Sequence, residues 1–159
     1  MEREFSLLFH LLGFGTLVTL AIAGNILESK YKKAPDLQTK AVLLGALKSI
    51  GILSPIAILV QLLTGLGNMH ALAISFSDFH WLQIKLVLFV IAAILGGLMG
   101  VQAKKRGVLV MQMLQGKAPA DAAKTLEGMD KVVGMLGMIL PVLLLAILCL
   151  SIYGRLGGQ

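Results

Sequence analysis

The sequence predicts an all-α integral membrane protein, a four-transmembrane-helix bundle that forms one domain over residues 1–159. Four apolar stretches lie at about 5–27, 44–66, 82–103 and 132–153. Each is close to the roughly 20 residues that a helix needs to cross a bilayer. Hydrophobic residues make up 57% of the chain and charged residues 14%, and the mean hydropathy is +0.89. These values lie outside the range of soluble domains.

The first stretch has a competing interpretation as a secretory signal peptide. Ala21-Ile22-Ala23 is similar to a small-residue cleavage site. However, Met1-Glu2-Arg3-Glu4 lacks the basic segment that precedes the apolar part of a signal peptide. We therefore expect a retained span.

Small and polar residues recur at helical spacing and indicate which faces turn into the bundle. On the second stretch Ser54, Gln61 and Gly65 share a face, and Pro55 predicts a bend, as Pro141 does in the fourth stretch. In the third stretch, Ala92, Gly96 and Gly100 form a ladder that lets another helix approach closely. The full faces comprise, on the first stretch, Ser6, His10, Gly13, Leu17, Ala21 and Gly24, and on the third, Lys85, Phe89, Ala92, Gly96, Gly100 and Ala103.

The connections decide the predicted orientation. Eleven of the fourteen Lys and Arg residues lie in two segments, 28–48 and 104–131. Because cytoplasmic loops carry an excess of Lys and Arg, we expect both termini and the 67–81 loop to lie outside. The net charge is +6. We expect the basic residues of these two segments to contact anionic lipid headgroups and not nucleic acid.

Both basic connections place a proline and an acid just ahead of a helical run, Pro35-Asp36 in one and Pro119 with Asp121 in the other. This pattern is typical of helix starts. In the longer second connection, we expect helices three and four to extend on the cytoplasmic side and to turn near Gly116. An amphipathic segment over 107–115, lying on the inner leaflet, is the alternative.

Two ionisable residues, His10 and Lys85, fall on inward faces at similar depth near the outer end. Ionisable residues inside spans are costly and are default candidates for a binding site. The alternative is structural: Lys85 extends to the outer headgroups and His10 bonds a neighbour. The outer loop adds Met69, His70, Asp78 and His80, which carry side chains that bind copper or another transition metal. A surface loop without metal explains the same residues.

A resemblance follows from two segments, Phe9-His10-Leu11-Leu12-Gly13 and Trp81-Leu82-Gln83-Ile84-Lys85-Leu86. They are similar to motifs of small bacterial four-helix membrane proteins that include the copper-resistance protein D type and the membrane-bound protoporphyrinogen oxidase. The resemblance implies a bacterial inner (plasma) membrane location and His10 as a ligand of haem b or copper. It places Lys85 near a bound porphyrin or another anionic group. Gln83 stands where the oxidases tend to have a histidine, which argues against porphyrin oxidation here.

Two functions are compatible with these residues. The first is a haem, porphyrin or metal site near the outer face between spans one and three, built on His10 and Lys85. The second is a non-catalytic accessory or assembly subunit that packs against a larger membrane complex or another copy of itself. The sequence contains no catalytic triad, paired carboxylates, phosphate loop or thiolate cluster, and Cys149 is its only cysteine. Porphyrinogen oxidase activity is implied by the resemblance alone, and we expect a binding role.

Overall fold

The computed structural model describes residues 2–156, which form five helices: α1 (Glu2–Lys32), α2 (Leu37–Gly51), α3 (Leu53–Ala71), α4 (His80–Leu114) and α5 (Ala122–Arg155). Within residues 2–156, four helical segments are long and apolar enough to span a membrane. The second of these segments, Leu37–Ala71, consists of α2 and α3 together. The predicted four-helix architecture is confirmed, and the chain is built as a multi-pass membrane protein.

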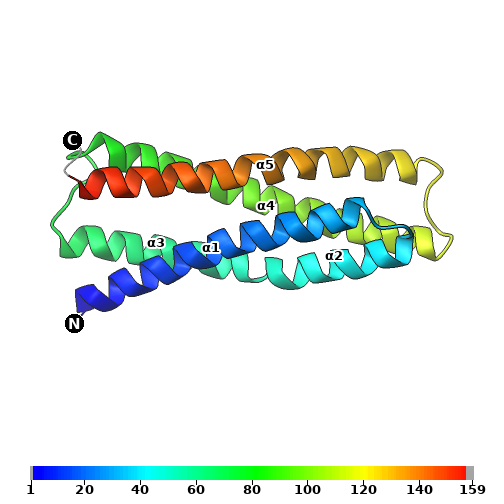
Figure 1. Cartoon of the computed structure of the whole chain (residues 1–159), viewed down its shortest axis with the longest axis horizontal. Coiled ribbons are helices and arrows are strands. Elements are labelled where there is room, and N and C mark those ends of the chain that lie inside the picture. Colours follow the sequence, from blue (N-terminus) through cyan, green and yellow to red (C-terminus); the bar gives the residue numbers. More distant parts are fainter. Residues whose placement is uncertain (1, 157–159) are drawn as a thin grey trace.

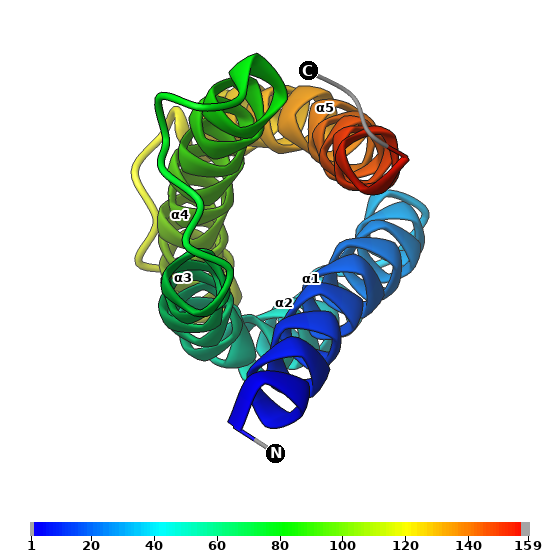
Figure 2. The same cartoon turned by 90° about the vertical axis from the view of Figure 1, so that its left-hand side faces the viewer.

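The helices run up and down along one long axis (Figure 1). The two described ends of the chain and the α3–α4 connection lie at one end of the bundle, and the basic connections 33–36 and 115–121 lie at the other. α1 packs on α2, α3 and α5, and α4 packs on α2 and α5. Viewed from the end that holds the termini, α1 and the beginning of α4 occupy opposite corners of the ring (Figure 2).

Apolar side chains cover the outside of the bundle. Ile94, Met138 and Val142 are 58%, 70% and 65% exposed. Contiguous apolar surface of this extent is unfavourable in water and favourable against acyl chains. Lipid is therefore the environment that this surface fits.

The second span is interrupted at one residue. Ile52 separates α2 from α3, and Pro55 follows in the first turn of α3. Proline has no N–H, and its ring collides with the carbonyl four residues earlier, here that of Gly51. The bend predicted at Pro55 is confirmed as a break just before it.

Helices begin directly after the predicted acids Asp36 and Asp121, and of the two only Asp36 makes a side-chain cap bond. Asp36 caps α2, since its carboxylate accepts a hydrogen bond from the Thr39 N–H at 2.7 Å. This bond lowers the pKa of Asp36. α4 is one continuous helix to Leu114, and Gly116 turns the chain with φ +67°. A continuous helix through 107–114 is confirmed. Its extension beyond the membrane on the cytoplasmic side stays a prediction.

Two buried clusters hold the bundle. One, near its middle, centres on Ala92, Leu144 and Ile147, with Phe89 packed against it. The other lies at the basic end around Tyr31 and Val110, both 0% exposed.

The predicted inward face of the third span is only partly packed. Ala92 is buried and Phe89 joins the middle cluster. A methyl group added at Gly96 or Gly100 would meet nothing within 4 Å. Within the described residues, the prediction of a close helix contact at these two glycines is therefore wrong.

Candidate functional site

His10 lies between α1 and α3. Its Nδ1 is 3.0 Å from Thr64 Oγ1, and its Nε2 is 3.0 Å from Gln61 Nε2. The Thr64 hydroxyl directs its own hydrogen to the Val60 carbonyl at 2.6 Å. It therefore accepts from Nδ1–H, and Nε2 of the neutral ring accepts from the Gln61 amide.

Glycines make this contact possible. A methyl group at Gly65 would lie 3.3 Å from His10 Cε1, and one at Gly13 would lie 3.0 Å from Gln61 Oε1. The inward faces predicted for spans one and two thus meet each other through His10, Gln61 and their glycines. Gln61 is 5% exposed.

The contacts of the His10 ring leave little room for a haem or a metal ion. Both ring nitrogens of His10 are bonded to α3, and Gly65 packs directly against the ring. A ligand on Nε2 would have to displace the Gln61 amide, whose Oε1 is buried without a hydrogen-bond partner. As arranged, the α1–α3 contact does not fit a porphyrin, because the two helices touch at the ring.

Lys85 lies half-buried on α4. The neighbouring Gln83, the position that departs from the oxidase pattern, donates to the Phe76 carbonyl at 3.0 Å. The beginning of α4 lies diagonally across the ring from α1 (Figure 2). The ring of His10 is hydrogen-bonded to residues of α3. A contact between His10 and Lys85 stays a prediction.

The outer-loop residues are dispersed. His70, Asp78 and His80 are exposed and Met69 is half-buried. The Asp78 carboxylate accepts from the Ser75 N–H at 2.7 Å and so shapes the α3–α4 turn. Within residues 2–156, no group of three His, Cys, Asp or Glu side chains is placed to hold a metal ion.

The most buried charged group was missed by sequence reasoning. Arg106, which the sequence placed in a basic cluster against lipid headgroups, is 1% exposed. Its two terminal nitrogens bond both oxygens of Glu28, at 2.7 and 2.9 Å, and one of them also bonds Asp130 at 3.0 Å. The guanidinium also lies 4.9 Å from the centre of the Tyr31 ring. We call these four residues the Arg106 cluster. It joins α1, α4 and α5 at the basic end, and the headgroup assignment of Arg106 is wrong.

A sequence signal for this cluster exists but is weak. Glu28 is the first acid after the first apolar stretch, and Asp130 lies two residues before the fourth. Carboxylates at the edge of two spans need a cation at the same depth. Three adjacent cations, Lys104, Lys105 and Arg106, are available, and only the rotation of α4 selects Arg106.

A third polar contact repairs the helix at its internal proline. Pro141 lies inside α5 and cannot donate to the carbonyl of Gly137. The Asn25 side chain donates to that carbonyl at 2.9 Å. In lipid, where water cannot replace the lost bond, this contact satisfies the backbone and ties α1 to α5.

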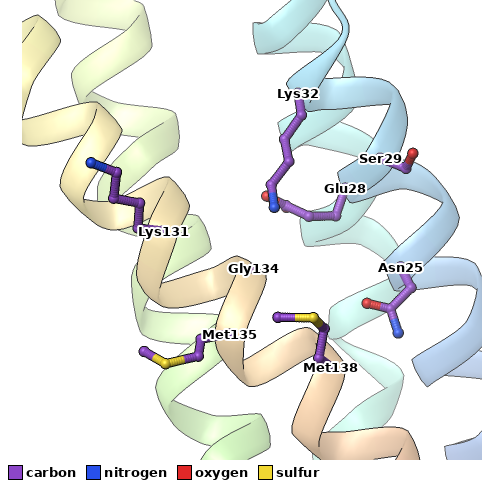
Figure 3. A pocket seen from close by; sticks show the side chains of 8 residues that line it. All are labelled: Asn25, Glu28, Ser29, Lys32, Lys131, Gly134, Met135 and Met138. Carbon is purple, nitrogen blue, oxygen red and sulfur yellow. The ribbon is translucent and has the colours of Figure 1, made fainter.

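A groove of about 490 Å³ opens between α1 and α5 beside the Arg106 cluster. Figure 3 shows side chains of both helices along it, charged toward the basic end and methionines deeper along α5. Its volume lies in the range of ligand sites, about 300–1,000 Å³.

Comparison of the chain with protein-family models, with curated proteins and with solved structures finds no match.

Proposed function

We propose that this protein is a non-catalytic accessory subunit of the membrane, whose polar residues hold its spans in a fixed arrangement for assembly with a larger membrane complex. The observation that carries the proposal is the bonding of both His10 ring nitrogens to α3. The residue with the strongest claim to ligand chemistry is thereby used to join two helices.

The other buried polar groups support the same role. The Arg106 cluster joins three helices, and Asn25 joins α1 to α5. Interhelical hydrogen bonds in membranes contribute on average about 0.6 kcal/mol each. Distributed along the bundle, they fix the rotation of every span and so present one defined apolar surface to neighbouring proteins.

The test is purification from membranes under mild detergent, followed by native mass measurement and a visible absorption spectrum. We expect a colourless, metal-free protein that associates with other membrane proteins, and a His10→Ala variant that is less stable and equally colourless. A Soret band or stoichiometric copper that disappears in His10→Ala would overturn the proposal.

A second candidate is the haem- or copper-binding protein that the sequence resemblance implies, with Lys85 close to the bound group. One observation favours it: the Thr64 hydroxyl accepts from Nδ1–H of His10, so Nε2 carries the lone pair that could coordinate a metal ion. Binding of copper would require Gln61 to move aside, and binding of a haem would also require α1 and α3 to separate at the His10 ring. A Gln61→Ala variant that gains haem or copper would support this candidate, and one that stays colourless would remove it.

We further propose that the protein lies in a bacterial inner membrane with its basic end in the cytoplasm and both termini outside. The Lys and Arg content of the two connections at that end supports this orientation. α4 and α5, at 35 and 34 residues, exceed the roughly 20 residues of a span, and we place the excess on the cytoplasmic side.

Single-cysteine labelling tests the orientation in a Cys149→Ser background. We expect an impermeant maleimide to label a Ser77→Cys variant on intact cells, and a Lys117→Cys variant only after lysis. The reverse pattern would overturn the orientation.

A further inference from the structure

We propose that the groove between α1 and α5 binds the anionic headgroup of a membrane phospholipid, with Lys32 as its principal cation. This inference is independent of the accessory role, since it concerns a different face and a different ligand. It rests on the shape of the groove, on its charge and on its change of polarity with depth.

The cation is held in the groove by the local sequence. An added methyl group at Gly134 would collide with Lys32 Nζ. The ammonium of Lys32 thus reaches from α1 across to the bare backbone of α5. A larger residue at position 134 would displace the ammonium from this position. The ammonium of Lys32 thus lies beside the α5 backbone, although its side chain is exposed.

The carboxylate in the groove is already hydrogen-bonded, and with Asp130 it shares one guanidinium, so that the three groups together carry one net negative charge. Glu28 lines the groove, and both of its oxygens bond the guanidinium of Arg106. Asp130 bonds the same guanidinium. Lys131 also lines the groove, and its ammonium is paired with Glu127 at 2.8 Å. Both side chains of that pair are exposed, at 76% and 66%, so the pair is weak and exchangeable. An anion entering the groove therefore meets the ammonium of Lys32, and Lys131, whose side chain extends away from α1, would have to leave Glu127 and turn toward it (Figure 3).

The polarity of the groove changes along its length in the order of a phospholipid. Lys32 and Lys131 lie toward the basic connections, and Met135 and Met138 lie deeper along α5 (Figure 3). The methionines are 55% and 70% exposed and continue into the apolar surface of the span. A headgroup at the lysines would direct its acyl chains along these methionines. A free phosphate would use the cations but leave the apolar half of the groove unfilled, and for this reason the lipid is the favoured occupant.

The experiment measures lipid retained by the purified full-length protein in nanodiscs that contain phosphatidylcholine with a minor fraction of phosphatidylglycerol. We expect selective retention of phosphatidylglycerol. Each basic residue near the membrane surface changes anionic-lipid affinity by about fivefold. Lys32→Gln should thus weaken retention about fivefold, and Lys32→Gln with Lys131→Gln about thirtyfold. Both side chains are exposed, so the variants should keep the fold, which thermal unfolding checks.

The matched control is Lys104→Gln with Lys124→Gln, which removes two exposed charges from the same end but outside the groove. Unchanged retention in this control, with loss in the groove variant, supports the proposal. Equal loss in both would show a general surface-charge effect and overturn it. Retention unchanged in the groove variant would also overturn it, as would full displacement of the lipid by inorganic phosphate at equal concentration.

Discussion

Replacement of Arg106 by methionine is the sharpest perturbation of this fold. The guanidinium is 1% exposed and makes three hydrogen bonds of 2.7–3.0 Å to two carboxylates on different helices. Arg106→Met keeps the apolar stem but leaves Glu28, whose side chain is 8% exposed, as an uncompensated buried charge. Removing one partner of a buried ion pair costs about 3–5 kcal/mol. We expect a loss of this size.

The assay is the free energy of unfolding in mixed micelles, measured by titration with a denaturing detergent. Lys105→Met is the matched control, because it removes the same charge from the neighbouring exposed position. Adding Glu28→Gln to Arg106→Met should recover part of the loss, since it removes the unpaired charge. An Arg106→Met protein as stable as Lys105→Met would refute the reasoning and return Arg106 to the lipid surface.

Three further perturbations follow from individual contacts. Asn25→Ala should destabilise the protein by about 0.6–1.7 kcal/mol, and by less in a Pro141→Ala background, where the restored N–H takes the same carbonyl; equal losses in the two backgrounds would contradict the repair of the helix. Gly154→Ala should cost about 1–3 kcal/mol, because its methyl group would lie 2.5 Å from the indole of the neighbouring tryptophan, whereas Gly96→Ala should be neutral or stabilising; thermal unfolding distinguishes them, and equal effects would refute the packing. The pKa of Asp36 is lowered, so its cap stabilises the start of α2 at pH values above the ordinary carboxyl pKa and is lost as the pH falls through the lowered pKa. Hydrogen exchange of the first turn of α2 should therefore rise in acid, and it should not change with pH in Asp36→Asn. An identical pH response of the two proteins would argue against the cap.

The spans, the helix starts and the inner turn could be predicted because each has a local cause. Apolar length defines the spans, Asp36 defines the start of α2, and Gly116 supplies the left-handed residue of the turn. The face of α1 that carries His10 also followed from spacing alone. What spacing could not supply is the partner of that face, which is Gln61 on α3.

The remaining features depend on the rotation and packing of helices that are distant in sequence. Arg106 is buried and Lys105 exposed because successive residues on α4 point about 100° apart. No other helix comes within 4 Å of a methyl group added at Gly96, and the spacing of small residues does not reveal this. The presence of Pro141 indicates that the Gly137 carbonyl of α5 lacks its helical donor. The sequence does not indicate which residue donates instead, because Asn25 is 112 positions away.

A double-mutant cycle of His10→Ala with Gln61→Ala measures whether His10 joins α1 to α3. We expect a coupling free energy of about 0.6–1.7 kcal/mol between the two residues, in a protein that carries no visible chromophore. Additive effects of the two substitutions, together with a chromophore that His10→Ala abolishes, would contradict it.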